Sequence, residues 1–330
     1  MPRVTLHAVG DVSFTRDIAT YVHRRRGGDY TYPLSFVKPE LSAADVTLAN
    51  LETTVRPASA TSRPAYPGNG PHFSSRPEAL KGLVDSGVDV VNLANNHIHD
   101  FGDKGLDTTV RLVERAGLVH VGTQASPARV LHIKGVRIGC VGMSRPFTKL
   151  RDSEVNVVDP ARVRPMLAQI LALRKQADVV VVNIHWGTEY TLRPNAQQQR
   201  LARAFVAHGA DVVMGHHPHV MQTMETVRTN GREGTIFYSL GNFLFDSHVQ
   251  TPGVRNTVIL RMVVDKQTDG RIDITYEYLP CVIHPERGYA PVPTTTRFRS
   301  VYPRQVTKRA EALRKYVGCA RGAGCVVNSS

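Results

Sequence analysis

The 330-residue chain is 42% hydrophobic and has a mean hydropathy of −0.21, as expected for a globular protein with one large α/β domain or two ordinary ones. No window approaches the roughly 18 consecutive apolar residues of a membrane span. The net charge of +13 and the pI of about 9.8 indicate a basic surface. Because no helix-turn-helix, RNP or zinc-finger pattern accompanies that charge, we expect a solvated face or an anionic small-molecule substrate rather than nucleic acid.

The N-terminal residues MPRVTLHAVGD run directly into a strand-like segment, without the charged and apolar regions of a signal peptide. We therefore expect a cytoplasmic protein. The four cysteines are Cys140, Cys281, Cys319 and Cys325. None forms a CxxC pair, which argues against a structural zinc site, and the spacing of the last two specifies no disulfide.

Strand-like and helix-like segments alternate along the first two thirds of the chain. Apolar runs rich in Val and Ile predict strands over residues 3–9, 44–50, 88–94, 136–142, 178–184 and 210–214. Helical periodicity predicts helices within 76–87, 103–117, 159–177 and 194–209. The last third predicts consecutive β segments over 235–245, 257–265 and 271–280. This order favours an α/β domain whose sheet continues into antiparallel strands.

Two segments differ in character from this domain. Residues 56–72 are rich in Pro, Ser and Gly and predict an exposed loop. After residue 285 the periodicity is lost, apart from one basic helical segment over 304–317, and the last residues predict disorder. We therefore expect a domain over residues 1–285 and a basic C-terminal extension over 286–330.

Polar residues with metal-binding side chains follow five of the predicted strands. They are Asp11, then Asn50 and Glu52, then Asn96, His97, His99 and Asp100, then His185 and Glu189, and finally His216, His217 and His219. Because the carboxyl ends of parallel strands share one edge of a sheet, we expect these side chains to meet there. Carboxylate, amide and imidazole donors together suit Mn, Fe or Zn better than Ca or a thiolate-bound ion.

The segment GHHPHV, residues 215–220, carries the densest set of candidate ligands. In an extended segment, residues i and i+2 point the same way. This spacing predicts that His217 and His219 face one cavity, while His216 turns aside to pack or to support the ligands. Pro218 fixes its own φ and stiffens the loop.

The blocks GDVSFTR, ANLETTV, NLANNHIHDFG, NIHWGTEY, GADVVMGHHPHVMQ and YSLGNFLFD occur in this order within residues 5–246. Together they resemble the poly-γ-glutamate capsule synthesis (CapA-like) family, which is related to the calcineurin-like metallophosphoesterases. The resemblance implies an α/β fold, a four-layer αββα metallophosphoesterase-like sandwich with two mixed β-sheets, and a two-metal cluster at the strand ends.

Carried over to this sequence, the resemblance implies two divalent ions, Mn, Fe or Zn. Asp11 would bind one ion and Glu52 would bridge both. The second ion would be held by Asn96, His185 and His217, and His219 would bind the first ion. Between such ions a bridging hydroxide attacks phosphorus.

Three further residues would act on the substrate. His97 would protonate the leaving oxygen or contact the substrate, and Asp100 would orient it. Arg16 would hold a phosphate or carboxylate oxygen, or would be a surface residue at a helix start. Glu189 fits the family block and would orient His185. His99 favours packing or support of the ligands.

Two departures from the calcineurin-like pattern bear on function. The first strand ends in Asp11-Val12-Ser13 without the usual Asp-x-His histidine, and the bridging residue is Glu52 rather than Asp. One hypothesis is a metal-dependent hydrolase or transferase acting on an anionic phosphorylated, acyl-phosphate, glutamyl or peptide-like substrate. The alternatives are a non-hydrolytic accessory protein of a poly-γ-glutamate or peptide ligase system, and a tailoring enzyme of secondary metabolism.

Overall fold

The computed structural model describes most of the predicted domain. The described residues are 1–294 without 58, 61–63, 66–69, 148–149, 151–152, 230, 248 and 250, together with 325–326. The predicted helix over 304–317, most of the predicted disordered tail, and Cys319 lie outside them. Cys140 and Cys281 are buried free thiols.

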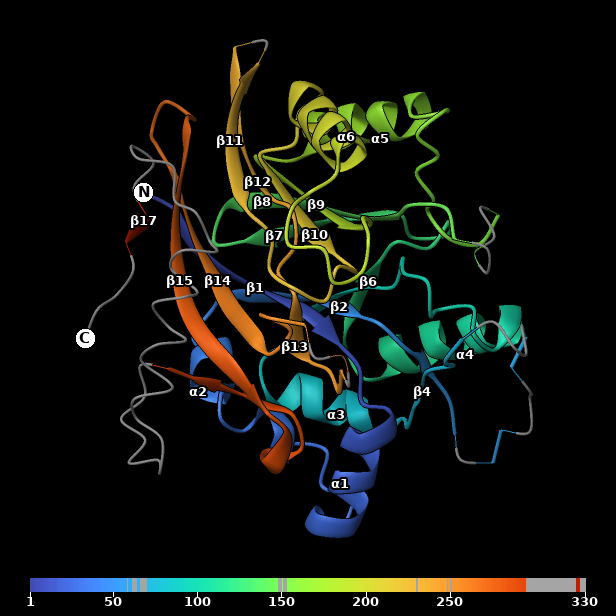
Figure 1. The fold of residues 1–330 in the computed structure, drawn as a ribbon. Coiled ribbons are helices and arrows are strands. Elements are labelled where there is room, and N and C mark those ends of the chain that lie inside the picture. The colour runs from blue at the N-terminus through green and yellow to red at the C-terminus, as the bar shows by residue number, and fades with distance from the viewer. Residues whose placement is uncertain are drawn as a thin grey trace.

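The first of two mixed sheets has the strand order β16-β15-β14-β1-β2-β5-β6, with β13 also beside β1 and β17 beside β15 (Figure 1). β1, β2, β5 and β6 are parallel, whereas β14, β15 and β16 extend the sheet in antiparallel fashion. Its strands are β1 (Arg3–Val12), β2 (Val46–Leu51), β5 (Val90–Asn92), β6 (Val119–Val121), β13 (Asn242–Leu244), β14 (Asn256–Lys266), β15 (Ile272–His284), β16 (Ala290–Pro293) and β17 (Cys325–Val326).

The second sheet has the order β11-β12-β10-β9-β8-β7. Its four inner strands are parallel, and β7 and β11 pair antiparallel at the two edges. The strands are β7 (Ala128–Ile133), β8 (Val136–Ser144), β9 (Val179–His185), β10 (Val212–His216), β11 (Met224–Thr229) and β12 (Arg232–Phe237). A small separate sheet pairs β3 (Thr54–Val55) with β4 (Ser74–Ser75).

Helices cover the outer faces of the two sheets, which pack against each other (Figure 1). The first sheet carries α1 (Arg16–Arg26), η1 (Tyr32–Leu34), α2 (Lys38–Leu41), α3 (Glu78–Asp85) and α4 (Gly102–Arg115). The second carries α5 (Arg164–Gln176) and α6 (Ala196–Ala207), and η2 (Pro285–Arg287) precedes β16. Three buried clusters fill the spaces between four layers, so the predicted αββα sandwich with two mixed sheets is confirmed.

Strand β9 shows why these sequences form buried strands. Val179 and Val181 enter the core between the sheets, whereas Val180 and Val182 pack beneath α5 and α6. Both faces are covered, so a continuous run of β-branched residues is stable there. The following helix α6 begins at a capping box, in which Asn195 accepts from the Gln198 backbone and the Gln198 side chain accepts from the Asn195 backbone.

The ligand-bearing strand ends do not lie on one sheet edge. β1, β2 and β5 belong to the first sheet, whereas β9 and β10 belong to the second. Our expectation of a single shared edge was therefore wrong, and the candidate ligands meet because the two sheets pack face to face. A glycine makes one close approach possible: a Cβ on Gly10 would lie 1.9 Å from the carbonyl oxygen of Gly241, to which Asp11 N–H donates at 2.9 Å.

Strand β16 lies beyond the predicted end of the main domain at residue 285 and pairs with β15. The division into a domain and a basic extension stays a prediction, as does the cytoplasmic location. Among the helices of the described residues, none is both long enough and apolar enough to cross a bilayer.

Candidate metal centre

Glu52 is the residue around which the other candidate ligands gather. It follows β2 directly and is fully buried. Its Oε1 lies 3.7 Å from His185 Nε2, 3.8 Å from His219 Nε2 and 3.9 Å from His97 Nε2. Among the described residues, neither carboxylate oxygen has a hydrogen-bond partner. Because an unpartnered buried carboxylate is strongly destabilising, this arrangement calls for a cation.

Asp11 is the second buried carboxylate, at the end of β1. Its Oδ1 accepts from Asn50 Nδ2 at 2.8 Å, and its Oδ2 accepts from the backbone N–H of His217 at 3.3 Å. Asn50 is held in turn by Asn92, whose Nδ2 donates to Asn50 Oδ1 at 3.0 Å. These amides, from the neighbouring parallel strands, fix the direction in which the Asp11 carboxylate points.

Asn96 and His185 approach each other from different sheets. Asn96 Oδ1 lies 2.8 Å from His185 Nε2, and the other ring nitrogen of His185 lies 3.2 Å from Asn50 Nδ2. Two donor atoms at this separation are spaced like neighbouring ligands of one ion with bonds of roughly 2.0–2.2 Å. Since Asn96 and Asn50 occupy both ring nitrogens, our interpretation that Glu189 orients His185 was wrong.

His217 and His219 reach the cavity through a strained turn. Their φ angles are 93° and 57°, in the region that favours glycine. The expectation of an extended segment with alternating side chains was therefore wrong, although the two rings do lie together, with centroids 6.0 Å apart. His219 Nδ1 lies 2.8 Å from Asn242 Oδ1, which leaves Nε2 facing Glu52. Such strain persists where surrounding contacts enforce it, commonly at functional sites.

Two groups of three ligand atoms each lie within 4.8 Å of one another: Glu52 with His217 and His219, and Glu52 with Asp11 and His185. Both contain Glu52. Carboxylate oxygens combined with imidazole nitrogens suit Mn, Fe or Zn, so the residues present fit divalent ions that share one carboxylate. His219 Nδ1 also lies 3.4 Å from Asp11 Oδ2, and the predicted division of ligands between two ions stays a prediction.

The two carboxyl groups respond in opposite ways to their surroundings. Burial, and then the charge of Asp11, raise the pKa of Glu52 well above its ordinary value. Burial also acts to raise the pKa of Asp11, but His216 and His219 outweigh it and hold that pKa well below the ordinary value. A divalent cation would allow both carboxylates to remain ionised.

The pKa values of the imidazoles also shift in opposite directions. Burial, followed by neighbouring histidine charges, lowers the pKa values of His185 and His217 well below the ordinary value. Burial also acts to lower the pKa of His219, but Glu52 and then Asp11 raise it to about 9. Neutral imidazole is the form that binds metal, and His185 and His217 are already held in it.

His97 is held by Asp100, the residue expected to orient it, and its role as a proton donor stays a prediction. His97 Nδ1 lies 2.7 Å from Asp100 Oδ2, which also accepts from the backbone N–H of Phe73 at 2.7 Å. The Phe73 ring stacks on the imidazole with centroids 3.8 Å apart. The Nε2 atom is thereby directed toward Glu52.

Arg16 lies at the start of α1 and lines the same cavity. Its Nε donates to Asp246 Oδ1 at 2.9 Å and its Nη2 to the Asp246 carbonyl oxygen at 3.1 Å. The guanidinium lies over the rings of Phe73 and Phe245, 4.5 and 5.5 Å from their centroids. Arg16 therefore lies both at a helix start and beside the cavity, where its ion pair with Asp246 holds it, and its role in binding a phosphate or carboxylate oxygen stays a prediction.

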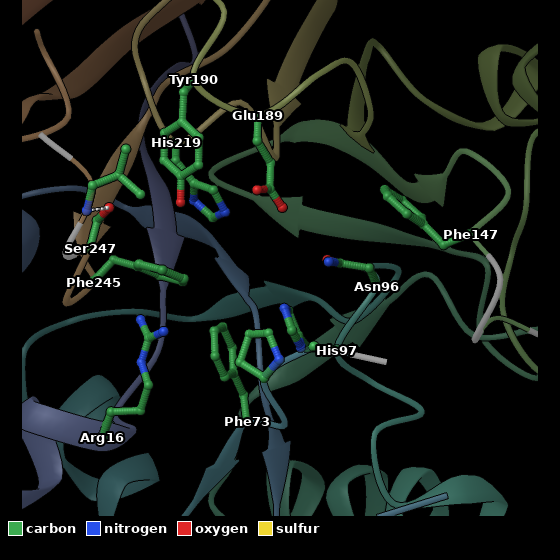
Figure 2. A pocket seen from close by; sticks show the side chains of 13 residues that line it. Arg16, Phe73, Asn96, His97, Phe147, Glu189, Tyr190, His219, Phe245 and Ser247 are labelled. Carbon is green, nitrogen blue, oxygen red and sulfur yellow. Dashed lines mark hydrogen bonds between the residues drawn. The ribbon is translucent and has the colours of Figure 1, made fainter. Parts of the chain in front are cut away.

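Two of the candidate ligands, Asn96 and His219, line a cavity of about 550 Å³ (Figure 2). Two aromatic rings of the cavity wall contact candidate imidazoles: Phe245 lies against His219 and Phe147 against His217, with centroid distances of 4.6 and 4.9 Å. Tyr190 adds a third ring, 5.8 Å from His219. The cavity thus has apolar walls around a polar floor, a composition typical of small-molecule sites.

His216 and His99 stay outside the cavity lining, as expected. His216 Nδ1 lies 3.5 Å from Asp11 Oδ1, and His99 Nε2 lies 3.7 Å from Asp103 Oδ1; both histidines are buried. The cavity-lining aromatics and Asp246 were not predicted from the sequence. Tyr190, Phe245 and Asp246 lie within the quoted blocks, but nothing in the sequence around Phe73 and Phe147 marks those two rings.

Comparisons with known proteins give the chain clear relatives. The sequence model of the family described as "Bacterial capsule synthesis protein PGA_cap" matches residues 5–247. The chain is 34% identical to the capsule biosynthesis protein CapA of Bacillus anthracis over 257 residues, which cover 74% of this chain and 60% of that protein. It is 32% identical to the PGA biosynthesis protein CapA of Bacillus subtilis (strain 168) over 308 residues, covering 91% and 77%.

The chain therefore spans 60% of the length of the first of these relatives. Among solved structures, the 5'-nucleotidase from Candida albicans SC5314 matches 94% of this chain and 58% of its own, at 12% identity and a TM-score of 0.44. This similarity is too remote to carry any argument about activity.

Proposed function

The chain belongs to the family of bacterial capsule synthesis proteins PGA_cap, and from this premise we propose that it is a metal-dependent hydrolase or transferase. Its substrate is an anionic phosphorylated, acyl-phosphate, glutamyl or peptide-like compound. The observation that carries the proposal is the pair of ligand groups that share Glu52, a fully buried carboxylate without a hydrogen-bond partner in the described chain.

In this proposal Asp11, Glu52, Asn96, His185, His217 and His219 hold two divalent ions. Bound there, the ions would polarise a phosphoryl or acyl oxygen and lower the pKa of water. The protein fixes the ligands through Asn50 and Asn242, which contact Asp11 and His219 at 2.8 Å. Ligands with such supporting hydrogen bonds lose little orientation when the substrate arrives.

His97 delivers a proton to the leaving oxygen, and Asp100 positions it. The 2.7 Å contact between His97 Nδ1 and Asp100 Oδ2 directs Nε2 toward the ligand cluster. Phe73 restrains the ring by stacking. A donor fixed in this way typically contributes about 10²–10⁴-fold to a rate.

The first experiment is elemental analysis of freshly purified protein, wild type beside Glu52→Ala, in buffers without chelator. We expect about two equivalents of Mn, Fe or Zn in the wild type and a sharp loss in the variant. Glu233→Ala, at an exposed position of β12, is the matched control and retains the metal. Phosphate esters and acyl phosphates are then screened with the metal-loaded protein. Full metal content in Glu52→Ala would remove the basis of the proposal.

One observation favours a second candidate, a non-hydrolytic accessory protein that binds an anionic chain. The first strand lacks the Asp-x-His histidine, and Ser13 in its place lies 3.0 Å from the hydroxyl of Thr15. A weaker first metal position would bind an anion without turnover. One equivalent of metal, with metal-dependent ligand binding and no product, supports this candidate; released phosphate from that ligand excludes it.

A further inference from the structure

Glu189 is a carboxylate that lines the cavity and has no role in the proposed chemistry. It lies in the loop after β9, four residues beyond His185, and lines the cavity. Within the described chain its carboxylate forms no ion pair or hydrogen bond. Figure 2 shows this carboxylate pointing into the cavity from the side opposite Arg16 and Phe73.

The backbone around Glu189 is built to hold it in that place. Gly187 has a φ of 86°, and a Cβ there would lie 2.8 Å from the amide of Gln198. Tyr190 has a φ of 58°, unusual for a residue with a side chain, and its N–H donates to the Pro218 carbonyl oxygen at 2.8 Å. The loop is thus tied to the ligand turn, and its strained backbone fixes the point from which the exposed Glu189 side chain extends.

The charge of Glu189 acts on two basic side chains, Arg145 and His219. Burial lowers the pKa of Arg145, and the charge of Glu189 acts in the opposite direction. Glu189 and Arg145 nevertheless form no ion pair in the described chain; the Arg145 guanidinium lies instead over the Phe147 ring, 3.9 Å from its centroid. The negative charge of Glu189 is therefore available to a ligand.

A free carboxylate in this position conflicts with a purely anionic substrate. Arg16, the guanidinium that lines the same cavity, is engaged by Asp246. The Glu189 carboxylate therefore repels an entering phosphoryl group, unless the substrate carries a positive charge at that point.

We propose that Glu189 is a specificity-determining residue that pairs with an ammonium group of the substrate. This inference rests on the proposed function, because it concerns the same cavity, and it narrows the substrate class to phosphorylated compounds that carry an amine. The pairing favours such compounds over neutral analogues of the same shape and excludes compounds whose second group is also anionic.

The test compares two phosphonates that differ only in charge at one end, 3-aminopropylphosphonate and butylphosphonate. Isothermal titration calorimetry with metal-loaded wild type is expected to give roughly tenfold to hundredfold tighter binding of the amine. Glu189→Gln abolishes this preference and keeps the metal content. Glu233→Gln, on exposed β12, is the control and preserves the preference.

The outcomes separate this inference from the proposed function. An amine preference without turnover of 2-aminoethyl phosphate supports the inference and counts against the hydrolase. Turnover of 2-aminoethyl phosphate and propyl phosphate with equal kcat/KM overturns the inference alone. Equal binding of the two phosphonates, or binding of neither, overturns it as well. Metal loss in Glu189→Gln would make this residue a ligand and would also overturn it.

Discussion

The two sheets contribute chemically different halves to the candidate metal centre. Asp11, Glu52 and Asn96 bring oxygen atoms from the first sheet, whereas the second sheet brings only imidazole nitrogens. In the oxygen half the difficulty is charge, because Glu52 is buried without a partner. In the nitrogen half it is conformation, because His217 and His219 adopt positive φ. A bound cation would neutralise the buried charge of Glu52, whereas contacts with neighbouring loops hold the positive φ of His217 and His219.

The largest effect is expected from a change to the oxygen ligands of the first sheet. Glu52→Gln removes the shared ligand, and we expect loss of most bound metal and a fall in kcat/KM of roughly 10³-fold or more. Without metal, the variant melts at a higher temperature than the wild type, since it no longer buries an unpartnered carboxylate. Elemental analysis measures the metal content, steady-state kinetics measure kcat/KM, and calorimetry in EDTA measures the melting temperature of the metal-free proteins. A lower melting temperature for Glu52→Gln than for the wild type in EDTA would contradict this account of the charge.

The next largest effect is expected at His97, whose Nε2 lies 3.9 Å from Glu52 Oε1. His97→Asn is expected to lower kcat for an alkyl phosphate by roughly 10²–10³-fold, because the leaving alkoxide then lacks a proton donor. For p-nitrophenyl phosphate, whose leaving group needs no proton, the loss is much smaller. Asp100→Asn gives the same pattern more weakly. Equal losses with both substrates would assign His97 to substrate binding.

Acid is expected to destabilise the fold through His7, a buried residue of the first sheet that lies outside the candidate metal centre. Burial, and then the charge of Arg261, lower the pKa of His7 on β1 from 6.5 to about 4. The unfolded chain binds a proton below pH 6.5, whereas the folded chain does so only near pH 4. The stability contribution of neutral His7 is therefore complete above pH 6.5 and is lost as the pH falls to 4, by about 3 kcal/mol.

Urea unfolding of metal-free protein at pH 7 and pH 4.5 measures this loss. His7→Gln is expected to reduce the difference between the two pH values. An unchanged difference would place the acid sensitivity in the metal centre instead.

The smallest effect is expected from the backbone strain at His217, whose φ is 93°. In metal-free protein, His217→Gly should be more stable than His217→Ala by about 1 kcal/mol, because glycine adopts the positive φ without strain. At His185, in strand β9, the order reverses, since glycine weakens a regular strand. Denaturant midpoints of the four variants test this. The same order at both positions would mean that the strain at His217 is relieved elsewhere.

The sequence singled out the candidate ligands but did not predict their geometry. Asp11, Glu52 and His185 were chosen because they end or follow apolar strands, and the structure brings their donor atoms together. The turn with the positive φ of His217 is held by distant parts of the chain: Asp11 accepts from the His217 N–H, and the Tyr190 N–H donates to the Pro218 carbonyl oxygen. The periodicity of a single segment carries no information about such contacts.

The stacking of Phe73 on His97 was equally beyond prediction. Phe73 follows a loop without periodicity, and the two residues meet only through the tertiary fold. The αββα layers were predicted through family resemblance, since apolar runs alone do not reveal how strands divide between two sheets.

The pairing of β1 also has a consequence for biosynthesis. This first strand lies between β2 and β14, and its end at Asp11 contacts the turn before β13. At roughly 5–20 residues per second, β14 leaves the ribosome on the order of 10–50 s after β1. During that time β1 offers an unpaired edge to other chains. The candidate metal centre, whose proposed ligands extend from Asp11 to His219, can form only after His219 has been synthesised.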